Sequence, residues 1–495
     1  MILRGIKELQ NGSDVRGIAM NGIIGEKPNF DPNMASKIAY TFATWLKEKT
    51  GKETLTVSVG HDSRLTAADF DTACCMGLIW AGVQVYDCGM ATTPSMFMTI
   101  VDPDMQCDGA IMITASHLPF NRNGLKFFTK DGGMEKDDLA EILARAEEIE
   151  TPLNTLGRRQ AHPYLLTYSE QIVSLIRERT GMTEPLKGAH IIVDAGNGAG
   201  GFFVEKVLDV LGADTTGSQF LEPDGLFPNH APNPEDPEAI ASVCKAVVDS
   251  GADMGIIFDT DVDRSAIIDE TGKPINRNAF IAFMAKMILS QNPGTTIVTD
   301  SITSTGLTKY IEDLGGTHHR FKRGYKNVIN EAIRLNAEGQ ETHLAMETSG
   351  HGAIKENYFL DDGAYLATMA LIEYTKLHAE GKKLSEYLID LQEPAEAVEV
   401  RYVIDAEDFK SYGADVLKDF SDFAAQQPGW EVVAPNYEGV RVACDEEHGN
   451  GWCLLRMSLH EPKMPLNIES DSEGGCALIK SVIDRFTEAH PELKA

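Results

Sequence analysis

The stretch TVSVGHDSR at residues 56–64 shows the pattern on which the fold is built. A short run rich in β-branched residues ends at a polar loop, and a helical pattern follows. The same arrangement returns at HIIVDAGNGAG (190–200) and at TIVTDSITSTG (296–306). The helical stretches expected after these three runs are Ala67–Ala81, Phe202–Leu211 and Leu307–Leu314. Buried strands that alternate with helices are typical of parallel α/β layers, so the sequence predicts three related α/β units.

Each unit carries a second apolar run that ends at a polar loop. These runs are GAIMITASH (109–117), MGIIFDTDVDR (254–264) and THLAMETSGHG (342–352). In parallel α/β sheets, functional residues gather in the loops at the carboxyl ends of strands. Three such loops in three related units therefore predict one shared central cleft.

The pattern changes at two polar or irregular stretches and again near residue 393. The stretches Glu150–Gln160 and Ala379–Pro394 contain no clear periodic pattern, and the last hundred residues show short alternating runs instead of strand–helix units. We predict three α/β domains with mainly parallel mixed sheets and a smaller C-terminal α+β domain. The expected ranges are 1–158, 159–274, 275–392 and 393–495.

The composition is that of a globular protein with a strong acidic excess. The chain has 495 residues, of which 75 are acidic and 44 basic, giving a formal net charge of −31. This charge argues against nucleic-acid and anionic-membrane partners. No apolar run of transmembrane length and no apolar signal core are present, and the eight cysteines form no CxxC pair. The expectation is a cytoplasmic protein with reduced thiols.

The loop Asp259-Thr-Asp261-Val-Asp263-Arg264 is a candidate magnesium site. Three carboxylates at alternate positions after a strand can converge on one hard cation, and Mg²⁺ prefers oxygen ligands. An EF-hand calcium loop is the rival interpretation, because the loop's positions one, three, five and twelve are acidic. The EF-hand turn needs Gly at position six, however, where this chain has Arg264. A solvated acidic turn remains the third alternative.

Ser116 follows another predicted strand and is the candidate nucleophile. A hydrolase elbow would need Gly two residues on either side, and this chain has Thr114 and Leu118 there. Acyl transfer is therefore not indicated. Lys126, ten residues further on, is a candidate for phosphate binding or proton transfer, with an exposed strand lysine as the alternative.

Three further loops carry groups suited to a sugar phosphate. Glu347 and Ser349 can point the same way and hold adjacent sugar hydroxyls, although a solvated loop is an equal alternative. The basic turn KRGYK (322–326), with Gly324 and Lys326, suits phosphate. In the last domain, Arg456 and Ser458 can hold phosphate oxygens.

The run GNGAGG (196–201) fits the dinucleotide-binding pattern GxGxxG after a strand. It would make the protein a nucleotide-dependent oxidoreductase. Asp194 precedes the run, however, where backbone amides would have to face a pyrophosphate. This interpretation is kept as a minor alternative.

Together these loops resemble the motifs of the α-D-phosphohexomutases, in the family's order and over the whole chain. TASHLP is similar to the family's TASHNP phosphoserine loop, DTDVDR to its DGDGDR metal loop, METSGH to its GExSGH sugar loop, and RMSLHEP to its RxSGTEP phosphate loop. GSDVRGI, which contains Arg16, and HAPNPEDPEAI are secondary matches. The resemblance implies three related α/β domains and a smaller fourth around a central cleft.

The resemblance also implies a mechanism, in which a phosphoserine passes its phosphoryl group to a hexose 1- or 6-phosphate. The resulting hexose 1,6-bisphosphate turns end for end and returns its other phosphate to the serine. Mg²⁺ would be the cofactor, and hexose phosphates the small-molecule partners. The implied catalytic residues are Ser116, His117, Lys126, Arg16 and Arg264. The implied metal ligands are Ser116, Asp259, Asp261 and Asp263. The implied sugar-binding residues are Gly324, Lys326, Glu347, Ser349 and His351, and the implied phosphate-binding residues are Arg456, Ser458 and His460.

Several positions depart from the family's motifs. Leu118 replaces Asn, Thr260 and Val262 replace the two Gly of the metal loop, and Leu459-His460 replaces a Gly–Thr or Asn–Thr pair. We hypothesise that His460 takes the place of the missing threonine. The Glu–Ser spacing favours phosphomannomutase or phosphoglucomutase activity. Phosphoglucosamine mutase and a non-catalytic sugar-phosphate-binding protein are the alternatives, and the oligomeric state is left open.

Overall fold

The computed structural model describes residues 5–150, 157–458 and 461–494. The chain divides into two compact units, each of which is described by itself. Unit 1 contains Met1–Asn276, Ser349–Gly352 and Leu360–Tyr387. Unit 2 contains Arg277–Thr348, Ala353–Phe359 and Leu388–Ala495. The four-domain division of the sequence stays a prediction.

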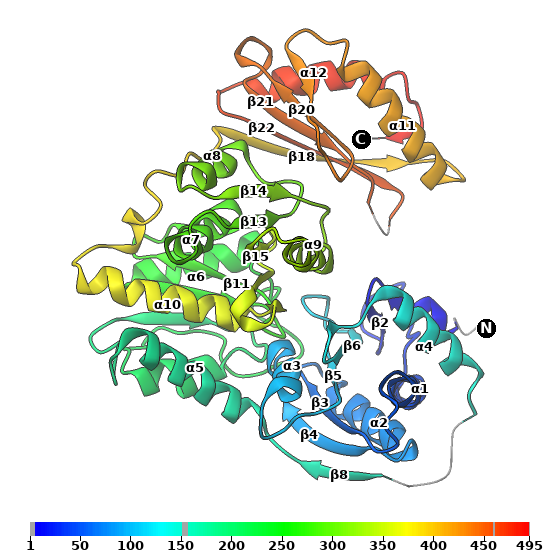
Figure 1. Cartoon of the computed structure of the whole chain (residues 1–495). Coiled ribbons are helices and arrows are strands. Elements are labelled where there is room, and N and C mark those ends of the chain that lie inside the picture. Colours follow the sequence, from blue (N-terminus) through cyan, green and yellow to red (C-terminus); the bar gives the residue numbers. More distant parts are fainter. Residues whose placement is uncertain (1–4, 151–156, 459–460, 495) are drawn as a thin grey trace. The chain divides into compact units, whose positions relative to one another are not determined.

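Unit 1 begins with a mixed sheet of eight described strands in the order β1-β2-β6-β5-β3-β4-β8, with β7 paired to β6 (Figure 1). Strand β3 is central and pairs in parallel with β4 and β5, whereas β6 joins β5 antiparallel. The strands are β1 (Gln10–Asn11), β2 (Asp14–Ile18), β3 (Thr56–His61), β4 (Gln84–Met90), β5 (Gly109–Ile113), β6 (Arg122–Thr129), β7 (Gly132–Gly133) and β8 (Arg158–Ala161). The TVSVGH run is thus a strand, and GAIMI is the strand beside it.

Helices cover this first sheet and bury its apolar side chains. They are α1 (Pro32–Thr50), α2 (Ala67–Trp80), α3 (Thr93–Val101) and α4 (Lys136–Glu148), after the short turn η1 (Ile6–Leu9). Helix α1 starts where the Asp31 side chain accepts the Met34 N–H and Pro32 follows, and it ends at Gly51, which has a φ of 68°. Cys74 and Cys75 belong to α2 and are fully buried in the core, as small apolar residues are.

The second sheet of unit 1 has the order β12-β11-β10-β9. Only the pair β9–β10 is parallel. Its elements are α5 (Leu165–Thr180), β9 (Ile191–Asp194), α6 (Pro237–Ser250), β10 (Met254–Phe258), β11 (Ser265–Asp269) and β12 (Pro274–Ile275). The helical pattern at Phe202–Leu211 forms a π-turn, η2 (Val204–Leu208), and a 3₁₀ turn, η3 (Asp209–Leu211), instead of an α-helix. Three valines and two phenylalanines there lower the α-helix propensity. 

The first part of unit 2 contains three parallel strands and the helices between them. Strand β13 (Thr296–Thr299) pairs in parallel with β14 (Thr317–Arg320) and β15 (Thr342–Met346). The helices of this part are α7 (Arg277–Gln291), α8 (Thr305–Asp313) and α9 (Tyr325–Ala337). Further along the chain lie β16 (Gly352–Ile354), η4 (Lys355–Asn357), β17 (Leu360–Asp361), α10 (Gly363–Ala379) and η5 (Leu384–Glu386), of which β17, α10 and η5 belong to unit 1.

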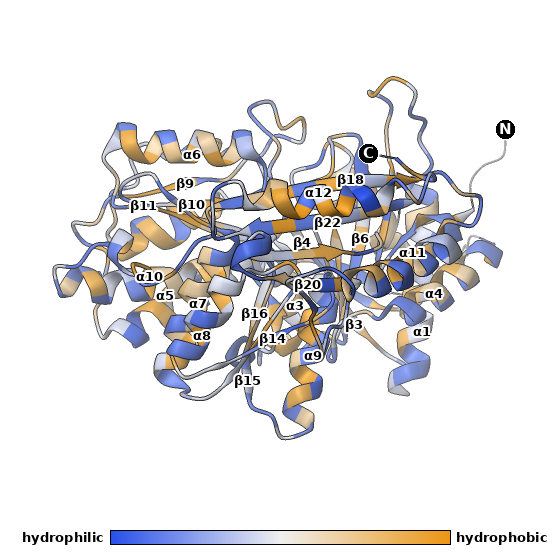
Figure 2. Ribbon diagram, turned by 90° about the horizontal axis from the view of Figure 1, so that it is seen from above, coloured by the Kyte–Doolittle hydropathy of each residue, from blue (hydrophilic) through white to orange (hydrophobic). Residues whose placement is uncertain are grey.

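The C-terminal part of unit 2 is an antiparallel sheet with two helices, in the strand order β19-β20-β21-β22-β18-β23. Its elements are β18 (Glu396–Ile404), α11 (Phe409–Ala424), β19 (Trp430–Val432), β20 (Val440–Cys444), η6 (Glu446–His448), β21 (Gly451–Leu455), β22 (Lys463–Ser470), α12 (Gly475–Thr487) and β23 (Leu493–Lys494). Figure 2 shows α12 with both apolar and polar turns, as expected of a helix that covers a sheet with one face. The predicted α+β fold of this region is confirmed.

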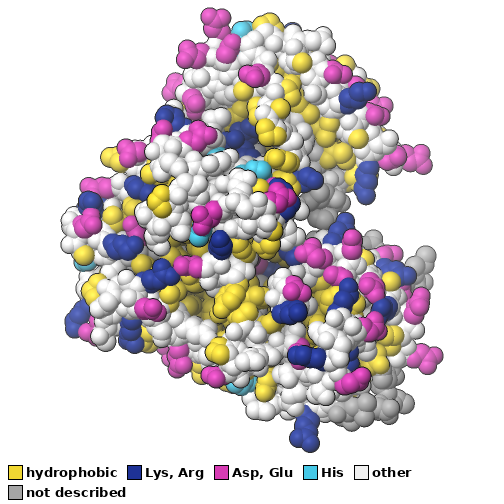
Figure 3. Space-filling view, in the orientation of Figure 1, with side chains coloured by type: hydrophobic (Ala, Val, Ile, Leu, Met, Phe, Trp, Pro, Cys, Tyr) yellow, Lys and Arg dark blue, Asp and Glu magenta, His cyan; other side chains and the backbone are white. Residues whose placement is uncertain are grey.

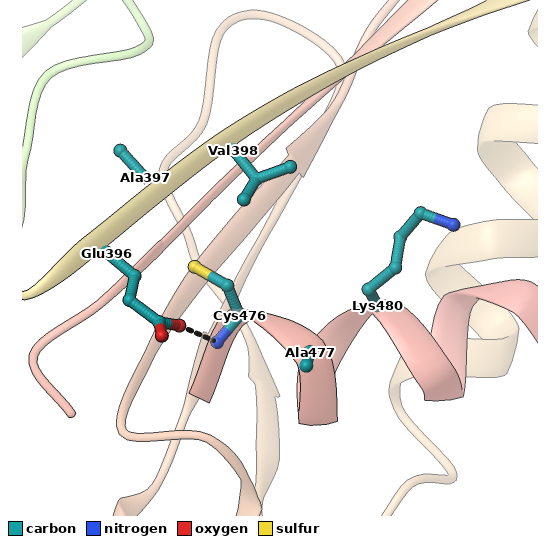
Figure 4. A pocket seen from close by; sticks show the side chains of 6 residues that line it. All are labelled: Glu396, Ala397, Val398, Cys476, Ala477 and Lys480. Atoms are coloured by element: carbon teal, nitrogen blue, oxygen red, sulfur yellow. Dashed lines mark hydrogen bonds between the residues drawn. The ribbon is translucent and has the colours of Figure 1, made fainter. Parts of the chain in front are cut away.

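In a pocket on this sheet, a carboxylate of the protein already caps the N-terminus of a helix. Figure 4 shows Glu396 beside the start of α12, where its carboxylate accepts the N–H groups of Gly474 (2.7 Å) and Cys476 (3.1 Å). The helix N-terminus, which would otherwise attract an anion, is therefore capped by a side chain of the protein.

The acidic excess is spread over the surface. Figure 3 shows Asp and Glu side chains across the visible face, with Lys and Arg scattered among them. All eight cysteines are free. Among the helices that the structure describes, none is long and apolar enough to cross a membrane.

A buried polar cluster joins β20–β22 to the loop after β13 within unit 2. Arg441 donates to the Ser301 carbonyl (2.9 Å) and the Thr303 carbonyl (3.0 Å), and its guanidinium lies 3.7 Å from the centre of the Trp452 ring. The Trp452 indole donates to Glu469 at 3.0 Å. Burial raises the pKa of Glu469 to about 7, although the indole and Arg441 oppose this shift. Glu469 is thus a carboxyl group that keeps its proton to near-neutral pH in the folded state.

We predict that Glu469→Gln changes how stability depends on pH. Because the folded-state pKa is raised, the wild type binds a proton between about pH 4.5 and 7 that the unfolded chain releases, and it loses this stabilisation as pH rises. The slope approaches ~1.4 kcal/mol per pH unit for one proton. Thermal unfolding at a series of pH values should show the stability of Glu469→Gln rising relative to that of the wild type as the pH increases across this window. Parallel curves would contradict the prediction, and Glu431→Gln, at an exposed position of β19, is the control.

Candidate active site

Ser116 lies at the carboxyl end of β5 in a backbone conformation that is rare for serine. Its φ is +49°, in the left-handed region, and its N–H donates to the Thr114 hydroxyl at 2.9 Å. A non-glycine residue held in this region is strained and is maintained only by its surroundings. The loop therefore presents the Ser116 hydroxyl in a fixed place.

Arg64 is the residue that holds this loop, and sequence reasoning did not select it. Its buried guanidinium donates to the carbonyls of Pro119 (2.9 Å), Arg122 (3.0 Å) and Leu118 (2.7 Å), and also to the carbonyl of Ser116. Asp62 balances its charge, with Oδ2 at 3.3 Å from Nε. Arg64 closes the TVSVGHDSR stretch, so its position after a strand was the only available signal.

The three predicted metal ligands converge after β10. Ligand oxygens of Asp259, Asp261 and Asp263 lie within 4.8 Å of one another, and all three residues are buried. Among the described residues, Asp261 Oδ1 and Asp263 Oδ1 have no hydrogen-bond partner. Buried carboxylate oxygens without partners, clustered in one loop, fit a hard divalent cation.

Val262 sits between two of these ligands with a φ of +63°. A β-branched residue in the left-handed region is a conformational outlier. The side chain is fully buried, and the Val262 carbonyl accepts the Gly363 N–H at 3.1 Å. The loop thus keeps a glycine-like conformation with a valine in place.

The GNGAGG run supports this acidic loop from the other side. The Ala199 N–H donates to the Thr260 carbonyl at 2.8 Å, and a Cβ at Gly198 would lie 2.7 Å from that residue's Cα. Asp194 Oδ1 accepts the Gly196 N–H at 2.9 Å, and Asp194 Oδ2 lies 3.0 Å from His230 Nε2. These glycines allow two backbones to approach, which accounts for the GNGAGG run without a dinucleotide.

Ser116 meets the acidic loop directly. Its hydroxyl donates to Asp259 Oδ2 at 3.2 Å and accepts from Arg264 Nη2 at 3.1 Å. The guanidinium of Arg264 also contacts Asp259 Oδ2 through Nε (3.1 Å) and lies 2.6 Å from His117 Nδ1. Burial, followed by the charge of Arg264, lowers the pKa of His117 to about 2, so this imidazole is neutral. Asn233, from the HAPNPEDPEAI match, accepts from Arg264 at 3.1 Å.

Lys126 and Arg16 complete the set around Ser116. Lys126 Nζ lies 2.8 Å from Asp261 Oδ2 and also pairs with Asp263, so it is a buried cation and not an exposed strand lysine. Although burial opposes the charge, Asp261 and Asp263 hold the pKa of Lys126 well above its usual value. Arg16 donates to the Thr114 carbonyl, two residues before Ser116, at 2.8 Å.

His351 and Ser349 also lie in unit 1. His351 Nδ1 is 2.6 Å from Asp361 Oδ2 and 3.9 Å from Asp263 Oδ1. Burial disfavours the charged imidazole, but Asp361 and Asp263 raise the pKa of His351 to about 9. Asp361 was not selected from the sequence, because nothing in its local pattern links it to the metal loop.

The remaining predicted residues belong to unit 2. Glu347 accepts the N–H of Gly324 at 2.6 Å, which brings the sugar loop to the basic turn that contains Lys326. Arg323 of that turn is paired with the buried Asp300 at 3.3 Å. Arg456 is buried at the end of β21, and the Ser458 N–H donates to the Lys463 carbonyl at 2.9 Å. His460 and Leu459 lie outside the described residues.

Comparison with known proteins identifies the family of this chain. The family models for phosphoglucomutase/phosphomannomutase α/β/α domains I, II and III match residues 7–152, 167–272 and 276–394, well over half of the chain. The chain belongs to this family. It is a phosphohexomutase, and its fold class and enzyme class are as predicted from the motifs.

Individual relatives cover nearly the whole chain. A phosphomannomutase/phosphoglucomutase of Pseudomonas putida is 29% identical over 487 residues, which is 97% of this chain and 96% of the relative. The crystal structure of a phosphoglucomutase/phosphomannomutase family protein from Burkholderia thailandensis is 25% identical, with a TM-score of 0.80 over 98% of this chain and 97% of that one. The N-acetylphosphoglucosamine mutase of Aspergillus fumigatus, solved with GlcNAc-6P and magnesium, shares the fold at 13% identity and a TM-score of 0.56, over 92% of this chain and 96% of that one.

We predict that the variant Val262→Gly is more stable than Val262→Ala, although glycine has the smaller side chain. The phosphohexomutase metal loop usually carries glycine at this position. Val262→Ala loses buried side-chain contacts but keeps the left-handed strain, whereas Val262→Gly loses slightly more contact and removes the strain. Because that strain costs about 1–2 kcal/mol, the glycine variant should be the more stable of the two by about 1 kcal/mol. Thermal or denaturant unfolding of both variants measures the difference. A less stable glycine variant would show that the loop carries no such strain.

Proposed function

We propose that this protein is a hexose-phosphate mutase that interconverts the 1-phosphate and 6-phosphate of mannose or glucose through a phosphoserine at Ser116. The observation that carries the proposal is the position of the Ser116 hydroxyl, within 3.2 Å of Asp259 and 3.1 Å of Arg264 in a buried, charged site. Phosphoryl transfer depends mainly on positioning and on charge neutralisation, and this site offers both.

In the proposed reaction, a sugar hydroxyl oxygen attacks the phosphorus of phospho-Ser116. The new bond from phosphorus to the sugar oxygen forms as the bond to Ser116 Oγ breaks, and the proton of the sugar hydroxyl balances the charge left on Oγ. The bisphosphate then reorients end for end in the site, and the reverse transfer returns its other phosphate to Ser116. Arg264 and Arg16 flank the transferring group, and Lys126 remains the candidate for proton transfer.

We further propose that Asp259, Asp261, Asp263 and the phosphate on Ser116 hold Mg²⁺. The unpartnered oxygens of Asp261 and Asp263 support this assignment. A bound Mg²⁺ would neutralise charge on the phosphoryl oxygens. The EF-hand alternative is disfavoured because strands β10 and β11 flank the loop where an EF-hand has helices.

Substrate recognition is assigned to the two remaining groups of residues. Gly324, Lys326, Glu347, Ser349 and His351 would bind the sugar, and Arg456, Ser458 and His460 would bind the phosphate that does not react. The relatives named phosphomannomutase/phosphoglucomutase support hexose phosphates as partners. Phosphoglucosamine mutase activity is the second candidate, and the fold shared with the Aspergillus mutase is what supports it. A cytoplasmic location remains part of the proposal.

Ser116→Ala should abolish turnover while leaving the fold intact, because the substitution removes only the hydroxyl that carries the phosphate. A coupled assay on glucose 1-phosphate and mannose 1-phosphate measures the activity and ranks the substrates. Intact-mass spectrometry should find one phosphate on the wild type and none on the variant. Normal turnover by Ser116→Ala would reject the phosphoserine mechanism.

Asp261→Asn should remove tight Mg²⁺ binding and lower kcat by at least about a hundredfold, because a neutral amide replaces a charged ligand. Calorimetric titration of the phosphorylated protein with Mg²⁺ measures the site directly. Asp269→Asn, in β11 outside the metal loop, is the control and should bind Mg²⁺ as the wild type does. Faster turnover with Ca²⁺ than with Mg²⁺ would show that the metal is wrongly assigned.

A further inference from the structure

Backbone donors converge at the start of α9, in unit 2. Arg323 and Gly324 directly precede this helix, where the positive end of the helix dipole and backbone N–H groups attract anions. Gly324, the N-cap residue, has a φ of +109° and no side chain of its own to cap the helix. Both N–H groups donate to carboxylates: Gly324 to Glu347 at 2.6 Å, and Arg323 to Glu438 at 3.2 Å. The protein's own acids thus occupy an anion-binding position.

Glu438 reaches this position from the C-terminal part of unit 2, where further contacts hold it. Its carboxylate also accepts the hydroxyl of Ser301, in the loop after β13. Three residues further on, Arg441 donates to the carbonyls of Ser301 (2.9 Å) and Thr303 (3.0 Å). Since Arg441 is buried and stacked on Trp452, the backbone that carries Glu438 is held against the Ser301 loop.

A buried arginine, Arg456, lies next to the backbone that follows Glu438. Gly439, next to Glu438, has a φ of +60°, and a Cβ there would lie 2.2 Å from the Leu455 carbonyl oxygen and 2.8 Å from Arg456 Cα. Arg456 is only 8% exposed, and its Nε has no hydrogen-bond partner among the described residues. The charged groups that act on Arg456 include Arg323, Glu438 and Asp300. A buried arginine with an unpartnered Nε therefore lies next to the backbone that carries Glu438.

We propose that Glu438 is a built-in competitor of the substrate phosphate: its carboxylate occupies donors at the start of α9, and a phosphate must displace it to bind between Arg323, Ser301 and Arg456. Phosphate oxygens accept from the same N–H, O–H and guanidinium donors as a carboxylate. Glu438 then sets the affinity for phosphate, and it satisfies the Arg323 N–H and the Ser301 hydroxyl when no ligand is bound. The inference rests on the proposed function for the identity of the natural ligand, a hexose phosphate.

An alternative role for Glu438 is to position Ser301 and Arg323 for the ligand. The two roles predict opposite effects when the charge is removed and the shape is kept. A glutamine amide still accepts from Ser301 and Arg323 through its oxygen, but it competes less well with an anion and does not repel one. A competitor therefore predicts tighter phosphate binding in Glu438→Gln, whereas a positioning residue predicts unchanged or weaker binding.

The experiment is calorimetric titration of the full-length protein with inorganic phosphate in buffer containing EDTA. Arg456→Gln assigns the signal, because only binding that this variant weakens comes from the Arg456 region. Glu438→Gln should lower the Kd for phosphate about tenfold, equivalent to ~1.4 kcal/mol. Glu438→Asp, which keeps the charge, should not tighten binding, and Arg456→Gln should weaken it. Glu431→Gln, at an exposed position on β19, should bind phosphate as the wild type does.

The outcomes separate this inference from the proposed function. Unchanged or weaker phosphate binding by a folded Glu438→Gln variant rejects the competitor role, even if the wild type is an active mutase. Wild-type phosphate affinity in Arg456→Gln also rejects it, because the phosphate would then bind elsewhere. Tighter binding by Glu438→Gln in a protein without activity on any hexose phosphate supports the competitor role and rejects the mutase. Should Glu438→Gln unfold, Glu438→Ala replaces it, with the same expected direction.

Discussion

Three carboxylates buried within 4.8 Å of one another impose the main physical constraint on unit 1. Burial and the neighbouring Asp263 hold the pKa of Asp259 well above its usual range, which shows how unfavourable the charges are together. The protein offsets this repulsion with Arg264 and Lys126, which contact the aspartates directly. One of these two cations, Arg264, also donates to the Ser116 hydroxyl. Stability of the loop and readiness for a phosphoryl group therefore have the same origin.

The backbone of the site carries a second constraint. Ser116 and Val262 both have positive φ values, so the nucleophile loop and the metal loop are each held in a conformation that L-residues rarely adopt. Such strain persists only where the surroundings fix the backbone. Arg64 does so for the Ser116 loop through four carbonyl contacts, and the GNGAGG run does so for the metal loop. The glycines that resemble a nucleotide-binding fingerprint thus serve backbone packing.

The strands and the reactive loops were predictable from sequence because their signals are local. An apolar run followed by Ser116 or by Asp259 places each group at a strand end without further information. Arg64 was missed because its role depends on a contact with Ser116, more than 50 positions away. Asp361 was missed because it contacts His351, whose own approach to Asp263 spans more than 80 positions. The turn at Val204–Leu208 was predicted as helix because periodicity does not distinguish an α-helix from a π-turn. Departures of single residues, such as Val262 for glycine, were visible in the sequence, but their consequence required the backbone angle.

Cations at the proposed phosphate positions are already paired with carboxylates, so a doubly charged anion binds there by exchange. Arg264 is paired with Asp259, Lys126 with Asp261, and Arg323 with Asp300. An incoming phosphate therefore replaces carboxylate contacts instead of meeting unpaired cations, and its affinity is the difference between two similar sets of charge-assisted hydrogen bonds. The acidic surface affects this balance little, because charges beyond about 8 Å are screened at physiological salt. Surface charge governs the rate of encounter, whereas the few carboxylates that touch the same donors as the phosphate govern how tightly it is held.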